Sequence, residues 1–142
     1  MNRNSKRAFV CAAFAMLVAS NSALGSDESV LVELNKLEPN EGDCRAYLVM
    51  KNESASAFES LKLDVVVFDT DGIVAKRLAV EAAPLPRDKT SLKVFDIGGL
   101  PCDRVGRVLL NEVMTCADDA QERGDCLELM TTSSRAAIDF IK

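Results

Sequence analysis

Apolar side chains that alternate with other residues over short runs constrain the fold of this chain more than any other feature. The clearest run is residues 61–68 (LKLDVVVF), in which Leu61, Leu63, Val65 and Val67 recur at every second position. Successive side chains of a strand point to opposite faces of a sheet, so a period of two indicates a strand with one buried face. We therefore predict a domain built mainly from β-strands.

The same period recurs along the chain between turn-forming segments. The predicted strands are Val30–Leu34, Cys44–Met50, Leu61–Phe68, Ile73–Val80, Ser91–Ile97, Arg104–Thr115 and Leu127–Thr132. Two prolines in Ala82–Pro86 cannot lie in a central strand, and we expect this segment to cross between sheets. Ser133–Lys142 is expected to form a final strand or one helical turn. About seven short strands predict an all-β fold, an antiparallel immunoglobulin-like β-sandwich.

The faces of one predicted strand can be read directly. In the second strand, one face carries Cys44, Ala46, Leu48 and Met50, and the other carries Arg45, Tyr47, Val49 and Lys51. The mostly apolar face is the one expected to be buried, because burial of apolar surface is the main favourable term in folding.

Asp69-Thr70-Asp71-Gly72 separates two of the predicted strands. An aspartate followed by glycine between two β runs favours a tight hairpin, since glycine adopts the positive φ that such turns need. The alternative is a calcium loop, but an EF-hand places its glycine sixth and a glutamate twelfth. The spacing here does not fit, so Asp69 and Asp71 are expected to serve the turn and not a metal site.

The first 25 residues have the order of an export signal. A basic start free of acidic residues is followed by the apolar run Ala8–Ala19 and then by Ala23-Leu24-Gly25. This order predicts a signal peptide, residues 1–25, cleaved before Ser26, and a single β-sandwich domain over residues 26–142. The run is too short to span a bilayer, which needs about twenty apolar residues. We therefore expect a periplasmic or secreted protein without a membrane span.

The export route is less sharply defined. Ser5-Lys6-Arg7-Ala8-Phe9-Val10 is similar to the twin-arginine export motif, with Lys6 in place of the first arginine. An ordinary basic start serves the general secretory route, which we favour, and the twin-arginine route stays open. Cys11 lies near the start of the apolar run, which does not fit lipidation, and is expected to leave with the signal peptide.

Charge and composition narrow the possible functions. After cleavage the chain carries 14 basic and 22 acidic side chains, a net charge of −8, which argues against nucleic acid and anionic membranes as partners. The chain has no histidine, the commonest general base and transition-metal ligand. We predict no catalytic residue, no metal and no cofactor, and therefore a protein that is not an enzyme.

Four cysteines remain after cleavage: Cys44, Cys102, Cys116 and Cys126. An even number in a small exported domain predicts two disulfides, and the close spacings of zinc and redox sites do not occur. Of the three possible pairings we predict Cys44–Cys102, whose members begin two strands at one end of the sandwich. Cys116–Cys126 would then close the base of a hairpin between antiparallel neighbours.

Two loops are candidate contact surfaces, Asn52–Ser60 and Asp118–Asp125. Asn52-Glu53-Ser54 fits the N-glycosylation triplet, but a loop asparagine that tolerates turn geometry is the interpretation we favour. Loops of this kind are more often plain solvated connections than contact surfaces.

The stretch Val49–Val80 supplies a resemblance. A strand that ends in an Asn-Glu-Ser turn, followed by LKLDVVVFDTDGIV, resembles the FxLYD-type immunoglobulin-like domains of bacterial envelope proteins. The layout is also similar to small exported proteobacterial proteins without an assigned function. The resemblance implies the fold and the envelope location, and it carries over no catalytic residue.

These observations predict a small non-catalytic binding or interaction module of the periplasm, with an envelope protein as its partner. A small-ligand carrier and an enzyme inhibitor are the alternatives. The carrier is disfavoured because only 5% of residues are aromatic, so the core must be filled to be stable.

Overall fold

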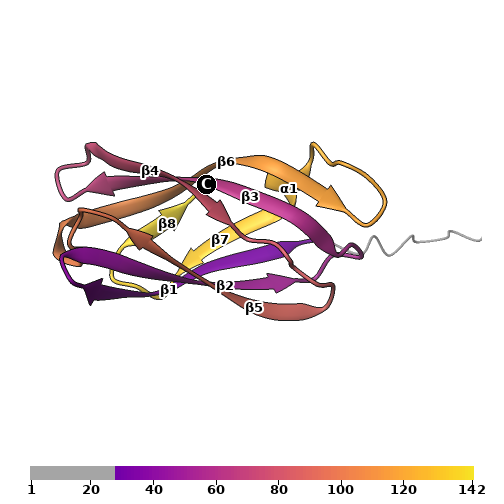
Figure 1. Cartoon of the computed structure of the whole chain (residues 1–142), viewed down its shortest axis with the longest axis horizontal. Helices are drawn as coiled ribbons and strands as arrows, with labels where there is room; N and C mark the ends of the chain where they lie inside the picture. Colours follow the sequence, from indigo (N-terminus) through magenta and orange to yellow (C-terminus); the bar gives the residue numbers. More distant parts are fainter. Residues whose placement is uncertain (1–27) are drawn as a thin grey trace, which may run out of the picture.

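The computed structural model describes residues 28–142, which form two four-stranded sheets packed face to face (Figure 1). The predicted signal peptide, its cleavage site and Cys11 lie outside the described residues. The elements are β1 (Val30–Asn40), β2 (Asp43–Asn52), β3 (Phe58–Asp69), β4 (Val74–Glu81), β5 (Lys89–Ile97), the 3₁₀ turn η1 (Cys102–Arg104), β6 (Val105–Asp118), α1 (Cys126–Leu129), β7 (Met130–Ser134) and β8 (Asp139–Ile141).

The strand order is β5-β2-β1-β7 in the first sheet and β4-β3-β6-β8 in the second. The pairs β1–β2, β2–β5, β3–β4 and β3–β6 are antiparallel, whereas β7 runs parallel to β1 and β8 runs parallel to β6. The predicted immunoglobulin-like sandwich is confirmed. It has eight strands in mixed sheets, because each sheet gains a short parallel strand from the C-terminal part of the chain.

The strand predicted at Leu127–Thr132 is the main correction. Leu127–Leu129 belongs to α1, and Met130–Ser134 pairs with β1 of the other sheet instead of returning along β6. Both edges of β6 are already occupied, one by β3 and the other by β8. The single helical turn of α1 therefore redirects the chain from the second sheet to the first.

The core lies between the sheets and follows the predicted period of two. Fully or nearly fully buried side chains come from alternate positions of three of the four central strands: Val30, Val32 and Leu34; Cys44, Ala46, Leu48 and Met50; Leu61, Leu63, Val65 and Val67. Each buried valine, leucine or methionine of this set contributes roughly 1.5–3 kcal/mol when it leaves water. The predicted burial of these faces of β2 and β3 is confirmed.

The β3–β4 turn is the tight hairpin expected from the sequence. The Asp69 carboxylate accepts hydrogen bonds from the backbone N–H groups of Asp71 and Ile73, both at 2.9 Å. Gly72 has a φ of 80° and donates to the carbonyl of Asp69 at 3.0 Å. Gly106 of β6 lies so close to this carbonyl that a Cβ there would overlap it. Asp69 thus stabilises the turn, because its carboxylate and its carbonyl both accept hydrogen bonds from backbone N–H groups of the turn.

Residues 82–86 cross from β4 to β5, as the two prolines predicted. Leu85 pairs with Phe58 through two backbone hydrogen bonds of 2.9 and 3.0 Å. The ammonium of Lys93 in β5 donates to the carbonyls of Ala83 and Pro84 at 3.2 and 3.1 Å. The crossing segment is therefore tied to both sheets.

The disulfides join Cys44 to Cys102 and Cys116 to Cys126, the same pairs as in the prediction. The first links β2 to η1, in the connection between β5 of the first sheet and β6 of the second, with a Cα–Cα distance of 4.7 Å. The second links β6 to α1 with a Cα–Cα distance of 6.5 Å and so fastens the passage to the first sheet. It does not join two antiparallel neighbouring strands as predicted, although Ala117 and Glu122 form an isolated antiparallel bridge inside its loop. Two disulfides indicate an oxidising location outside the cytoplasm. Among residues 28–142, no helix has the length and apolar character to span a membrane.

Candidate functional site

The two candidate loops meet at one end of the sandwich. The Ser56 hydroxyl donates to Asp118 at 3.2 Å and accepts from the Arg123 guanidinium at 3.0 Å. Arg123 also binds Asp125 through two hydrogen bonds of 2.9 and 2.7 Å, and lies 3.7 Å from Glu28. The sequence predicted these segments separately, and the structure shows that they form one junction around Arg123.

The polar groups of this junction are paired with one another or with the backbone. The Arg123 side chain is 13% exposed, and the neighbouring carboxylates, Asp125 above all, raise its pKa. Backbone N–H groups of Ala120 and Gln121 lower the pKa of Asp118. Arg123 also lies 5.9 Å from the centre of the Phe58 ring. The junction is therefore best explained as a tie between loops.

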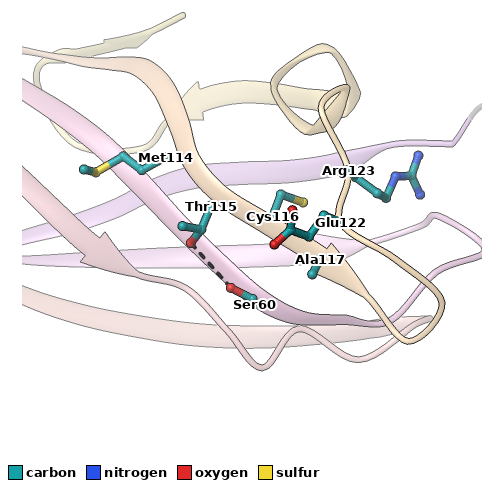
Figure 2. A pocket seen from close by; sticks show the side chains of 7 residues that line it. All are labelled: Ser60, Met114, Thr115, Cys116, Ala117, Glu122 and Arg123. Carbon is teal, nitrogen blue, oxygen red and sulfur yellow. Dashed lines mark hydrogen bonds between the residues drawn. The ribbon is translucent and has the colours of Figure 1, made fainter.

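A pocket of about 320 Å³ lies beside this junction (Figure 2). Its lining residues are Ser60, Met114, Thr115, Cys116, Ala117, Glu122 and Arg123. The Ser60 hydroxyl donates to Thr115 at 3.4 Å, so its proton is not directed at a base that could activate it. Within residues 28–142, no group of three or more potential metal ligands gathers at one point.

Asn52 has a structural role at the end of β2. Its side chain is fully buried, donates to the carbonyls of Ser56 and Leu85 at 2.8 and 3.1 Å, and accepts from the N–H and hydroxyl of Ser54. An amide nitrogen in this position is not accessible to a glycan. Asn52 is the last residue of β2 and not a residue of the loop, so the interpretation as a loop asparagine with turn geometry is corrected; its buried side chain holds the loop that follows.

A second buried polar side chain lies on the outer face of the second sheet. The carboxylate of Asp64 in β3 is 2% exposed and receives two hydrogen bonds from Arg77, at 2.8 and 2.9 Å, and one from Asn111 at 2.7 Å. These hydrogen bonds, led by those of Arg77, lower the pKa of Asp64 although burial acts in the opposite direction. Asp64 therefore connects β3 to β4 through Arg77 and to β6 through Asn111.

The outer face of the first sheet carries an unusual set of apolar side chains. In the β2–β5 register, Val49 pairs with Leu92 and Tyr47 pairs with Val94, so all four share that face. Leu31 of β1 lies diagonal to Val49, since its direct partner is Lys51. Leu92, Val94 and Leu31 are 59%, 47% and 37% exposed. We call these five residues the apolar patch.

Charged side chains surround the apolar patch, and they are paired with each other. Arg45 binds Asp96 through two hydrogen bonds of 2.7 and 3.1 Å, and Arg135 donates to Glu33 at 3.0 Å. Two further pairs are Lys36–Glu38 and Lys51–Glu53. We call these four pairs the ionic rim. It holds four positive and four negative charges.

The face is also hollowed, over residues of all four strands of the first sheet. A shallow depression of about 300 Å³ is lined by Leu31, Glu33, Val49, Lys51, Thr90, Ser133 and Arg135. It combines the apolar floor of the patch with members of the rim. An apolar centre inside a polar rim is the usual anatomy of a protein–protein contact.

The sequence contained part of the signal for this patch. Tyr47 and Val49 were assigned to the less apolar face of their strand, which is where the structure places them. In β5 the inner positions are Ser91, Lys93, Phe95 and Ile97, so Leu92 and Val94 point outward. Only the pairing of β5 with β2 brings these apolar side chains together, and that pairing is not visible in the sequence.

The comparisons support the fold. The solved structure described as a structural characterization of IrmA from Escherichia coli matches with a TM-score of 0.52 and 10% identity, over 74% of this chain and 91% of that one. No family model and no curated protein matches the sequence. The FxLYD resemblance is therefore not supported by a family match. The structural match supports only the small sandwich fold.

Proposed function

We propose that this protein is a non-catalytic binding module that acts outside the cytoplasm and contacts a protein partner through the outer face of its first sheet. The observation that carries the proposal is the apolar patch: Leu92 and Val94 are about half exposed and lie beside Tyr47 and Val49. Contiguous exposed apolar surface on a small soluble protein marks an interaction site more often than an isolated residue does.

Other parts of the molecule give less support to the alternatives. The space between the sheets is occupied by packed side chains such as Leu48, Met50 and Leu63, which disfavours a small-ligand carrier that uses the interior. The Arg123 junction commits its polar groups to each other. The face of the first sheet combines exposed apolar area with a polar boundary, and so suits a protein partner best.

A photo-crosslinking amino acid placed at Leu92 tests the proposal in the native envelope. The matched control is Val74, which is 58% exposed on edge strand β4 of the other sheet, against 59% for Leu92. We expect a discrete protein adduct from position 92 and none from position 74. Adducts of equal yield from both positions, or from neither, would contradict a binding role for this face.

A further inference from the structure

We propose that the occupant of the apolar patch is a second copy of this chain, bound face to face through the first sheets of the two molecules. This inference rests on the proposed function and names its partner. In such a contact the same surface serves both copies, so the apolar patch of one copy meets the apolar patch of the other around a two-fold axis. Two outer faces about 10 Å apart would then pack as the inner faces of a sandwich do.

The distribution of charge favours a copy over a strongly charged partner. The ionic rim is neutral, with four cations and four anions. Elsewhere, residues 28–142 contain ten basic and seventeen acidic side chains, a net charge of −7. Because opposite charge steers partners together, a neutral face offers nothing to a highly charged protein. Two acidic copies repel each other least when they approach through this face.

The geometry of β5 decides between a face contact and an edge contact. β5 is an edge strand with nine consecutive residues in unbroken register with β2, which would suit the addition of another strand. However, Lys93 lies in its middle, on the inward side, with its ammonium bound to the carbonyls of Ala83 and Pro84. A strand added here would bury that charge, so the second copy is placed on the face.

The area of the face is small, which indicates a weak contact between the two copies. Four strands about 4.8 Å apart and about seven residues long, at about 3.3 Å each, give roughly 450 Å² per copy. The total of about 900 Å² is below the range of stable complexes. We therefore expect a weak dimer that dissociates on dilution.

Sedimentation equilibrium of the purified, disulfide-bonded protein, from micromolar to millimolar concentration, tests this inference. We expect a monomer–dimer equilibrium whose dissociation constant rises at least tenfold in Leu92→Glu and in Val94→Glu, because each places two like charges in an apolar contact. Val74→Glu should leave the dissociation constant of the dimer unchanged. Raising the salt concentration from about 20 to about 200 mM should tighten the dimer, since it screens repulsion between two acidic molecules.

The outcomes separate this inference from the proposed function. A protein that stays monomeric up to millimolar concentration, or a dimer that Val74→Glu disrupts and Leu92→Glu does not, would overturn it. If the adduct at position 92 in the envelope has the mass of a different protein while the purified chain is monomeric, the binding role stands and the second copy is refuted. Thermal unfolding of each variant, which should match the wild type, confirms that the substituted proteins are folded.

Discussion

The carboxylate of Asp64, in the middle of β3, is buried and hydrogen-bonded in the folded protein. Arg77 covers it from β4, and Asn111 donates to it from β6. The Arg77 side chain itself is 62% exposed, so water screens the pair on one side. Hydrogen bonds to an ionised carboxylate contribute more than those between neutral groups, which makes this position sensitive to protonation.

The pH dependence of Asp64 follows from the sign of its pKa shift. Its folded pKa lies below the ordinary value, so its contribution to stability is complete above a pH of about 3.9 and is lost as the pH falls through the folded value. We expect Asp64→Asn to lower the free energy of unfolding by roughly 1–3 kcal/mol at pH 7, and by less below pH 4. Urea unfolding across this pH range measures the difference.

The matched control for this prediction is Asp71→Asn in the β3–β4 turn. Asp71 is 76% exposed and lies 3.6 Å from Arg104. This change should stay within about 0.5 kcal/mol of the wild type at every pH, as exposed substitutions usually do. An Asp64→Asn difference that is the same at pH 3 and pH 7 would show that its effect comes from shape and not from charge.

Among the elements, the disulfides fasten two of the five places where the chain changes sheet, the connections from β5 to β6 and from β6 to β7. Cys44–Cys102 closes a loop with a sequence separation of 58, and Cys116–Cys126 one of only 10. If the main effect of a bridge is to restrict the unfolded chain, the longer loop stabilises more, by about 4 kcal/mol against about 3 kcal/mol. The two bridges are therefore expected to differ in how much they stabilise the folded protein, as well as in position.

Paired substitutions test this order. We expect Cys44→Ala with Cys102→Ala to reduce the free energy of unfolding by about 4 kcal/mol, and Cys116→Ala with Cys126→Ala by about 3 kcal/mol. Urea unfolding of the two proteins, each with its other bridge intact, gives the comparison. The chain-entropy explanation fails for this fold if the short bridge proves the more important one.

The elements also show what the sequence could and could not predict. The central strands β2 and β3 were predictable, because their apolar side chains alternate on one buried face. β7 was assigned to the wrong partner, since Met130–Ser134 (MTTSS) has one fully buried side chain and its pairing with β1 joins residues about one hundred positions apart. The apolar patch depends in the same way on the register between β2 and β5, which no local pattern encodes.

The whole molecule is a small sandwich whose stability depends on its covalent links. A domain of this size is stable by only about 5–15 kcal/mol. Contributions of about 4 and about 3 kcal/mol from the bridges are a large part of that total. We therefore expect the folded state to be well populated only in an oxidising compartment.

Production in the reducing cytoplasm tests this dependence. The chain from Ser26 onward, expressed there without its predicted signal peptide, should give little soluble protein and should be degraded quickly by added protease. The same chain directed to an oxidising compartment should be soluble and resistant. A reduced protein that melts cooperatively at the temperature of the oxidised one would contradict the expectation.

The parallel strands β7 and β8 affect the order in which the fold can be completed. Each sheet has a long strand, β1 or β6, whose outer edge is covered only by one of these two short strands. During synthesis the ribosome makes Met130–Ser134 and Asp139–Ile141 after every strand that they cover. A nascent chain that still lacks them exposes both backbone edges, which favours association with other chains. Translocation of an unfolded chain before these strands can pair would postpone that exposure until the whole sandwich is able to close at once.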